Sequence, residues 1–507
     1  MSFCVHDISP YAELLLKENL INNNDNDKNN DSVSSCWASD WFELLLKKIA
    51  IAKLGPTVTS RWLFIAANCV YNALFFNANV IESVDTQYWV NNNNNNNRKK
   101  AIVLNNMQAI VEHACHYAFP LLIRTYMSLP LTNEEVDAIV RLHTPLDPVN
   151  PSDLENLRVE ISSYLSARDG DGWKLTTTFN GTLPNGSNTI DVTNINSQNL
   201  NNLPDTLKWT PLSFNGATKR YLTPEWGTVN RGVIPEADWQ AILGNALELF
   251  PSTNDFIQEM RDVEAVTENL TEKQKMIAEF WAGGPGSVTP PGMWMVFTDL
   301  AIRSNELSLL HEIRLYTLIA TGLYQAGISA WRLKRDKLQA RPVQMIRELY
   351  YQQQINGWNT VPISGEFWMP YQTSDFVTPP FPDFVSGHST FSATSARLLF
   401  HFFQNDVITM KKPVTSGIVQ YLTPMLKSSQ NVNVTLNDMF IYPHRGIIEP
   451  SVPLSGISLE WNRWSDMAKD SGESRIYGGI HVESSNQAGL LLGKQLGDYL
   501  WNMMKGI

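Results

Sequence analysis

Residues 386–403 read SGHSTFSATSARLLFHFF, and this stretch is the best guide to the fold class. Its apolar residues follow helical spacing, and its first turns carry mainly small side chains. Small residues let a neighbouring helix approach closely, so the stretch predicts a helix inside a packed bundle. Ser386-Gly387-His388 opens it with a hydroxyl, a glycine that lets the backbone approach an anion, and an imidazole. Taken alone, this tripeptide also fits an ordinary N-cap turn.

Helical patterns extend outward from this stretch in both directions. The chain has 507 residues, of which 43% are apolar, enough to bury a large core. The predicted helical segments are residues 1–20, 37–80, 101–129 and 133–142, most of the chain from residue 235 onward, and within that part residues 306–338, 386–403 and 483–504. These segments predict a mostly α-helical protein built from bundles.

Several residues mark where these helices begin and end. Thr271 with Gln274 resembles a capping box that opens a helix. Thr289 followed by two prolines fits an N-cap with proline in the first turn. Pro342 is expected to end the long helical pattern of residues 306–338.

Residues 170–235 differ from the rest, because they are rich in Asn, Thr, Gly and Pro. They predict a long irregular insertion with β-prone pieces at 173–179 and 189–192, and a hairpin at Asn185-Gly186. The Asn-rich tracts 22–31 and 91–97 are interpreted as loops. We therefore expect an all-α chain of two regions. Residues 1–250 would be an N-terminal helical region with the irregular insertion, and 251–507 a C-terminal helical domain that carries the site.

Composition excludes several functions. A net charge of −11 argues against nonspecific binding to nucleic acid or acidic membranes. The apolar stretch 315–331 is interrupted by polar residues, so it predicts a buried helix and no membrane span. Residues 1–20 lack a signal-peptide pattern, which makes an intracellular location the default expectation. The four cysteines show no metal spacing and are interpreted as free thiols.

Two basic segments add to Ser386-Gly387-His388. Lys334 is followed seven residues later by Arg341, about two helical turns away, so both could face one direction. Ser474-Arg475 is followed by His481 beside two glycines. Each segment alone fits a solvated helix end or a glycine loop. Together they supply the cations and imidazoles that a tetrahedral oxyanion such as phosphate or vanadate needs.

In order and spacing, the three segments resemble the signature of the vanadium-dependent haloperoxidases. This family shares its core with the type-2 phosphatidic acid phosphatases. The family pattern is Lys-x6-Arg-Pro, then Pro-Ser-Gly-His, then Ser-Arg-x5-His, and this chain has every charged and catalytic position of it. The resemblance covers roughly residues 270–507. It implies a site between the helices of two related four-helix bundles.

The resemblance also implies a role for each matching residue. The oxyanion oxygens would be held by Lys334, Arg341, Ser386, the Gly387 amide and Arg475. His481 would bind the central atom, which is vanadium in a haloperoxidase and phosphorus in a phosphatase, and His388 would be the acid–base group. Catalysis would rest on His388, His481 and Lys334.

The implied activity is a vanadate-dependent haloperoxidase that oxidises halide with hydrogen peroxide to hypohalous acid. Vanadate is the implied cofactor, and hydrogen peroxide and a halide are the substrates; the organic acceptor is not indicated. Relatives often assemble, so a homo-oligomer is compatible with the resemblance. The alternative is a soluble, acid-phosphatase-like enzyme acting through a phosphohistidine on His481. A third class is a noncatalytic oxyanion-binding protein.

Two aromatic residues favour the haloperoxidase. Trp331 and Phe381 stand where the chloroperoxidase branch also has Trp and Phe, and they would form the halide site; the competing interpretation is two core aromatics. Acid phosphatases usually carry Asp at the position of Ser485.

Two departures from the family pattern remain. Val385 replaces the usual proline before Ser-Gly-His. Gly283 stands where an acidic residue would support Arg475, which puts chloride oxidation in more doubt than bromide or iodide oxidation.

One further group of residues has the composition of a metal site. His113 and His116 are three residues apart and follow Glu112, so on a helix they could ligate a metal. A plain helix surface is the preferred interpretation.

Overall fold

The structure is a computed structural model. It describes residues 37–75, 107–143, 149–177, 190–191, 206–214, 217–409, 411, 418, 421–422, 440–442, 446–452 and 457–504. The segment 1–20 and the Asn185-Gly186 turn lie outside these residues.

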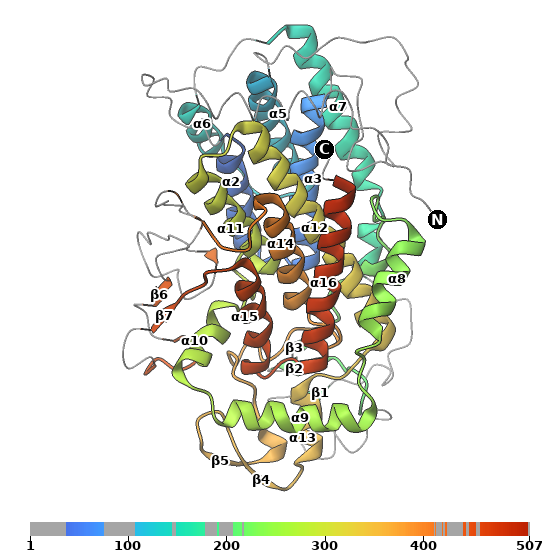
Figure 1. Cartoon of the computed structure of the whole chain (residues 1–507), viewed down its shortest axis with the longest axis vertical. Coiled ribbons are helices and arrows are strands. Elements are labelled where there is room, and N and C mark those ends of the chain that lie inside the picture. Colours follow the sequence, from blue (N-terminus) through green and yellow to red (C-terminus); the bar gives the residue numbers. More distant parts are fainter. Residues whose placement is uncertain are drawn as a thin grey trace.

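Long helices of the C-terminal half form the centre of the molecule. They are α12 (Leu309–Lys337), α14 (Gly387–Phe403) and α16 (Glu483–Met504), which run side by side along the long axis (Figure 1). α14 packs against α12, α16 and α15 (Trp464–Tyr477), and α11 (Thr289–Asn305) lies against α12 and α14. This arrangement places the N-terminal end of α14 inside the bundle.

Glycines on α16 explain how closely α14 and α16 approach. Gly489, Gly493 and Gly497 lie four residues apart and therefore share one face of the helix. A Cβ atom at Gly489 would lie 2.7 Å from the carbonyl oxygen of Ser386, and one at Gly493 would overlap that of Thr390. The backbones are in contact, as the small residues of 386–403 predicted.

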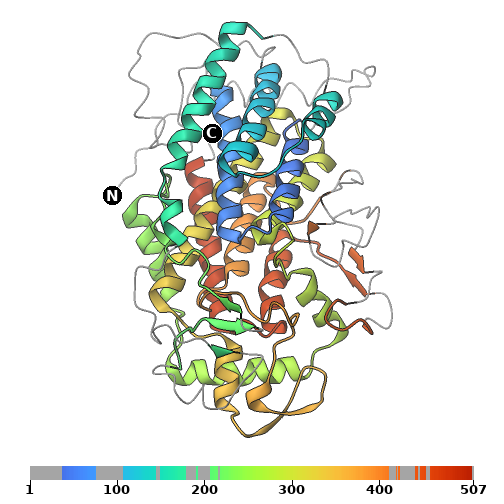
Figure 2. The same cartoon turned by 180° about the vertical axis from the view of Figure 1, so that it is seen from behind.

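Helices of the N-terminal half pack on this centre. α3 (Pro56–Phe75) lies along α12, and α2 (Trp37–Ile51) contacts α11 and α12. Figure 2 shows them in front of the C-terminal helices. The remaining elements of this half are α5 (Met107–Leu121), a π-helical turn (Leu122–Tyr126), α6 (Asn133–Leu142), α7 (Pro151–Asp169) and α8 (Glu236–Leu247).

A buried polar network joins α2 to α12. The carboxylate of Glu312 accepts hydrogen bonds from the amide (2.9 Å) and hydroxyl (3.0 Å) of Ser39. The Tyr316 hydroxyl lies 2.8 Å from the Ser39 hydroxyl and donates to Asp299 at 2.6 Å. Glu312 and Asp299 are at most 3% exposed, so these contacts specify how the two halves dock.

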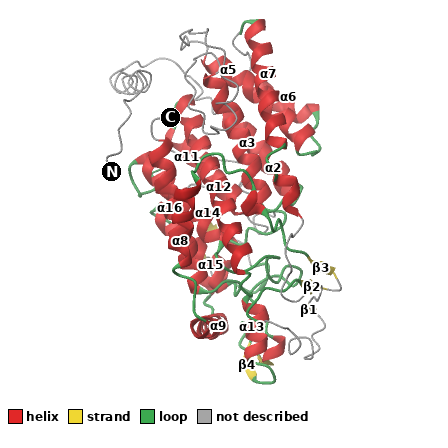
Figure 3. Cartoon of the chain, turned by 90° about the vertical axis from the view of Figure 1, so that its right-hand side faces the viewer, coloured by secondary structure: helices red, strands yellow, loops and turns green. Residues whose placement is uncertain are grey.

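α9 (Thr253–Glu268) and α13 (Pro342–Leu349) lie side by side at one end of the molecule, together with strands β4 (Gln354–Asn356) and β5 (Pro362–Ser364) (Figures 1 and 3). The other elements are α10 (Glu272–Phe280), 3-10 turns at Trp173–Thr177, Trp226–Thr228 and Gly365–Phe367, and strands β1 (Ile190–Asp191), β2 (Leu212–Phe214), β3 (Ala217–Lys219), β6 (Phe440–Tyr442) and β7 (Ile457–Leu459). β1 pairs parallel to β2, and β2–β3, β4–β5 and β6–β7 pair antiparallel.

The predicted all-α class is confirmed, and so are several boundaries. α6 and α16 have the predicted limits, and α14 begins at Gly387 with Ser386 as its N-cap. The Thr271–Gln274 capping box is present. Among the described residues, no helix combines the length and apolarity needed to cross a bilayer. The division of the chain at residue 250 stays a prediction.

Two predicted helix boundaries were wrong. Pro342 begins α13, whereas α12 ends at Lys337 because residues 338–340 pair with another segment. The Trp209 amide donates to the Leu338 carbonyl at 2.6 Å. Lys334 and Arg341 therefore do not lie on one helix. Thr289 is not an N-cap either, since the cap position is Val288.

One predicted β-prone piece was also wrong. Residues 173–177 form a 3-10 turn, because the side chain of Asp171 accepts from the Trp173 amide at 3.0 Å and pairs with buried Arg61 at 2.8 Å. The other piece, 189–192, contains the short strand β1.

Candidate active site

The predicted site residues lie at the ends of different helices. Lys334 is in the last turn of α12, Arg341 is the N-cap of α13, and Ser386 is the N-cap of α14. Arg475 is in the last turn of α15, and His481 lies in the short connection to α16. Each of these side chains is at most 2% exposed.

The hydrogen bonds of Arg341 indicate what kind of group the site would bind. Its Nε donates to the Phe381 carbonyl (2.8 Å), and its Nη1 donates to the Ile480 carbonyl (2.6 Å) and lies 3.0 Å from His481 Nε2. Nη2 is buried with no partner among the described residues. An unsatisfied buried donor costs about 1–3 kcal/mol, more if charged, so the structure favours an acceptor here.

Lys334 is held by backbone oxygens. Its ammonium donates to the carbonyls of Pro382 and Asp383, both at 2.8 Å. It lies 5.0 Å from the centre of the Phe381 ring and 5.8 Å from that of Trp331, within the range of a cation–π interaction. Burial, followed by the nearby Arg341, lowers the pKa of Lys334 well below its ordinary value.

Trp331 and Phe381 lie together beside this ammonium. Their ring centroids are 4.8 Å apart, and the Trp331 indole is anchored by its donation to the Leu222 carbonyl at 3.0 Å. A Cβ atom at Gly387 would be 3.5 Å from the Trp331 ring. The aromatic pair therefore forms an apolar wall next to the Ser386-Gly387-His388 turn.

His388 lies in the first turn of α14 and remains partly accessible. Its Nε2 is 2.8 Å from the Trp281 carbonyl, which can only accept, so Nε2 carries the proton and Nδ1 is an acceptor. Gly283 adopts φ +56°, and a Cβ there would come within 3.1 Å of His388 Nε2. Burial, then Arg475 and His481, lowers the pKa of His388 well below its ordinary value.

Arg475 is supported by neutral groups. Its Nη2 donates to the Ala278 carbonyl (2.7 Å), Nε to the Ser474 hydroxyl (2.9 Å) and Nη1 to the Ala282 carbonyl (3.4 Å). Backbone carbonyls at the negatively polarised C-terminal end of α10 therefore support Arg475. In the family pattern an acidic residue, at the position of Gly283, would have this role. Burial, followed by Arg341, lowers the pKa of Arg475 to about 9.

Asp383 is a site residue that the sequence analysis missed. Its carboxylate contacts His481 Nδ1, and it is fully buried. The Ser485 hydroxyl lies 3.2 Å from the same nitrogen. A lone carboxylate within the apolar, proline-rich segment 379–385 was the available signal. Burial raises the pKa of Asp383 to about 6, against the opposing effect of Arg341.

The structure thus brings the predicted residues into one cluster. Arg341 contacts His481, Arg341 and Arg475 interact electrostatically, and both affect His388. Lys334 and Arg341 interact with the Asp383 carboxylate, Arg475 interacts with Arg341, and burial opposes the charge of all three basic side chains. A bound oxyanion would offset the cost of burying these positive charges, because it supplies negative charge and hydrogen-bond acceptors together.

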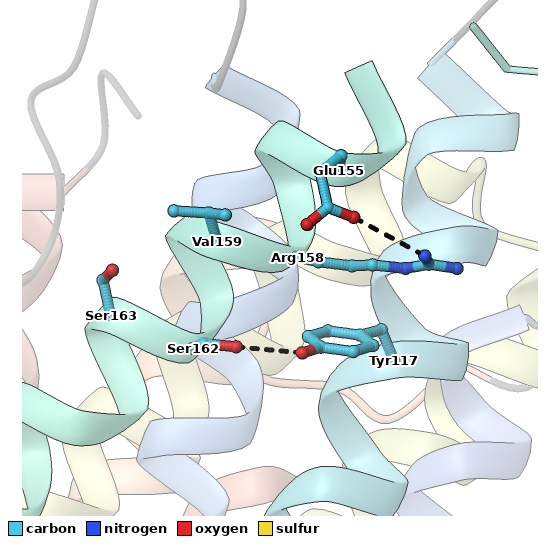
Figure 4. Close-up of a pocket in the computed structure, with 6 residues that line it drawn as sticks. All are labelled: Tyr117, Glu155, Arg158, Val159, Ser162 and Ser163. Atoms are coloured by element: carbon cyan, nitrogen blue, oxygen red, sulfur yellow. Dashed lines mark hydrogen bonds and ion pairs between the residues drawn. The ribbon is translucent and has the colours of Figure 1, made fainter. Parts of the chain in front are cut away.

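A separate hollow lies between α5 and α7, away from these residues. It has a volume of about 580 Å³, and Figure 4 shows its lining: Tyr117, Glu155, Arg158, Val159, Ser162 and Ser163. Tyr117 and Ser162 share a hydrogen bond of 2.9 Å, and Arg158 pairs with Glu155 at 3.8 Å. Four of the six lining residues pair with one another in this way, and none of the predicted site residues is among the six.

Comparison with known proteins identifies relatives of this fold. Residues 314–507 match the family described as the VCPO second helical-bundle domain. The holo form of a bacterial vanadium-dependent chloroperoxidase is 17% identical and has a TM-score of 0.63; the match covers 95% of this chain and 98% of that one. For the apo form the values are 16%, 0.62, 89% and 95%. A bacterial vanadium-dependent iodoperoxidase gives 18%, 0.59, 94% and 98%. A comparison with curated proteins gave no match.

Proposed function

We propose that this chain is a vanadium-dependent haloperoxidase that binds vanadate and oxidises halide with hydrogen peroxide; the match of residues 314–507 to the VCPO second helical-bundle domain supports this. One observation carries the proposal. Nη2 of Arg341, which has no partner among the described residues, belongs to a buried cluster with Lys334, Arg475 and Asp383, and Nη1 of the same guanidinium contacts the accepting Nε2 of His481. That donor set suits a tetrahedral oxyanion with several negatively charged oxygens.

Vanadate fits the residues that are present. Lys334, Arg341 and Arg475 would donate to its oxygens, with the Ser386 hydroxyl and the Gly387 amide, and the Nε2 lone pair of His481 would be the metal ligand. Bound vanadate would supply a Lewis-acidic centre that activates hydrogen peroxide toward a halide without changing oxidation state.

The other residues would act on protons and on the halide. Nδ1 of His388 would accept a proton from incoming hydrogen peroxide, because the donation of Nε2 to the Trp281 carbonyl leaves Nδ1 as the acceptor of the neutral ring. Trp331 and Phe381 would form a dry wall beside the cationic Lys334, where a large, weakly hydrated anion is favoured. Bromide and iodide are therefore the proposed halides. Chloride is less expected, because neutral carbonyls support Arg475.

A phosphatase is the second candidate, because phosphate has the shape and charge of vanadate. The contact between Asp383 and His481 favours it, since a carboxylate on Nδ1 also makes Nε2 a better nucleophile. Reconstitution with vanadate and measurement of peroxide-dependent bromination, beside phosphate-ester hydrolysis without vanadate, separates the two. Strong hydrolysis with no bromination would reverse the ranking.

Variants of the two histidines test the assigned roles. His481→Ala is expected to lose vanadate retention, whereas His388→Ala should keep the anion and lose turnover. His311→Ala is the control, because this histidine lies in the first turn of α12 at the end opposite Lys334. Unchanged turnover and vanadate retention in both site variants would refute the roles assigned to the two histidines.

A further inference from the structure

The two ring nitrogens of His481 have different partners. Nε2 lies 3.0 Å from Nη1 of Arg341, and a guanidinium can only donate, so Nε2 must accept and carries no proton. Nδ1 faces the Asp383 carboxylate and, at 3.2 Å, the Ser485 hydroxyl. The ring proton therefore resides on Nδ1 and is donated to the carboxylate.

We infer that Asp383 is the positioning residue of this site: its carboxylate fixes the Nδ1-protonated tautomer of His481 and directs the Nε2 lone pair at the oxyanion. Its role in vanadate binding rests on the proposed function. Without the carboxylate, only the Arg341 contact would oppose the Nε2-protonated form, which cannot ligate a metal.

Asp383 is itself held on several sides. Its amide donates to the Gln339 carbonyl at 3.0 Å, and its carbonyl accepts from Lys334 at 2.8 Å and from the Ser485 hydroxyl at 3.1 Å. The residue is fully buried. One residue thus orients an oxygen-binding cation through its backbone and the ligating imidazole through its side chain.

The carboxylate comes from a different part of the chain than in the acid phosphatases, which usually have Asp four residues after the motif histidine. Here that position is Ser485. Because Ser485 reaches the same nitrogen, the two side chains can be exchanged without changing composition. This exchange tests whether the site needs a carboxylate on Nδ1 rather than an aspartate at position 383.

The experiment compares the full-length wild-type chain with Asp383→Ala, Asp383→Asn, the double exchange Asp383→Ser/Ser485→Asp, and the exposed control Asp375→Asn. The tautomer of His481 is read by ¹⁵N NMR in vanadate-free protein, with its signal among the 9 histidines assigned by its loss in His481→Ala. Vanadate affinity is measured by titration calorimetry, and circular dichroism confirms folding.

Wild type and Asp375→Asn should show the Nδ1-protonated tautomer. Asp383→Ala should populate the other tautomer and bind vanadate roughly 10–100-fold more weakly. Asp383→Asn should keep the tautomer, since its amide oxygen can accept, and lose less affinity. The exchange variant should recover the tautomer and most of the affinity. If Asp383→Ala does not fold, the Asn and exchange variants decide.

Three results would overturn the inference. The first is an Nε2-protonated His481 in the wild-type protein. The second is an exchange variant that folds but shows the tautomer and affinity of Asp383→Ala. The third is an Asp383→Ala variant that is less stable but keeps the wild-type tautomer of His481, as a purely structural role of Asp383 would give. Absence of vanadate binding by the wild type would defeat the proposed function, while the NMR measurement would still decide the role of Asp383.

Discussion

Gly489→Ala on α16 is expected to damage the oxyanion site although residue 489 contributes no side chain to it. A Cβ atom there would lie 2.7 Å from the Ser386 carbonyl oxygen and 2.8 Å from Ser389 Cβ. Ser386 is the N-cap of α14 and begins the turn that contains Gly387 and His388. The added methyl group must therefore push α16 away from this turn or displace the turn itself.

The magnitude follows from these distances. Ordinary van der Waals contact begins at 3.4 Å, so the backbones must separate by about 0.7 Å. Overpacking costs about 1–3 kcal/mol, and the upper part of that range applies because the opposing atoms are backbone. Replacing a helical glycine by alanine returns about 1 kcal/mol, which leaves a net loss of about 1–2 kcal/mol. A displacement of this size exceeds the roughly 0.5 Å tolerance of a binding constellation, so we expect vanadate affinity to fall about tenfold or more.

Gly497→Ala is the matched control, because it lies two turns further along the same face of α16. Its added Cβ would be 2.8 Å from Arg397 Cβ and 3.1 Å from the Thr394 carbonyl oxygen. Both variants should shift the urea-unfolding midpoint downward, and only Gly489→Ala should weaken vanadate binding in titration calorimetry. Equal losses of affinity in the two variants, or none in Gly489→Ala, would refute the reasoning.

Two further predictions concern buried charge. Burial raises the pKa of Glu312 from 4.5 to about 8. The protonated side chain therefore contributes fully to the stability of the folded protein below about pH 4.5, and this contribution is lost as the pH rises toward 8. Glu312→Gln should remove this loss, so denaturant unfolding should show a flatter decline in stability between pH 5 and 8; parallel curves would contradict it. Arg475→Lys should weaken vanadate binding roughly 10–100-fold, because one ammonium cannot replace the fork that reaches the Ala278 and Ala282 carbonyls and an oxyanion. Calorimetric titration of vanadate measures this, and an unchanged affinity would show that charge alone suffices.

The sequence by itself determined the helices and the residue types of the site. The limits of α6 and α16 and the Thr271–Gln274 cap follow from interactions within about four residues, which periodicity and capping preferences record. The three motif segments identified every basic and imidazole group in the cluster, but they did not identify the carboxylate of Asp383. The small residues of 386–403 also predicted the close packing of α14 against a neighbouring helix.

Only the tertiary structure decided how these segments meet. α12 ends before Arg341 because residues 338–340 pair with residues 207–209, which no local pattern records. The contact of Asp383 with His481 and the carbonyl partners of Arg475 join positions roughly a hundred or more apart in sequence. Such contacts depend on how the helices pack against one another. Local sequence patterns do not indicate which distant backbone oxygen or carboxylate will face a given cation or imidazole.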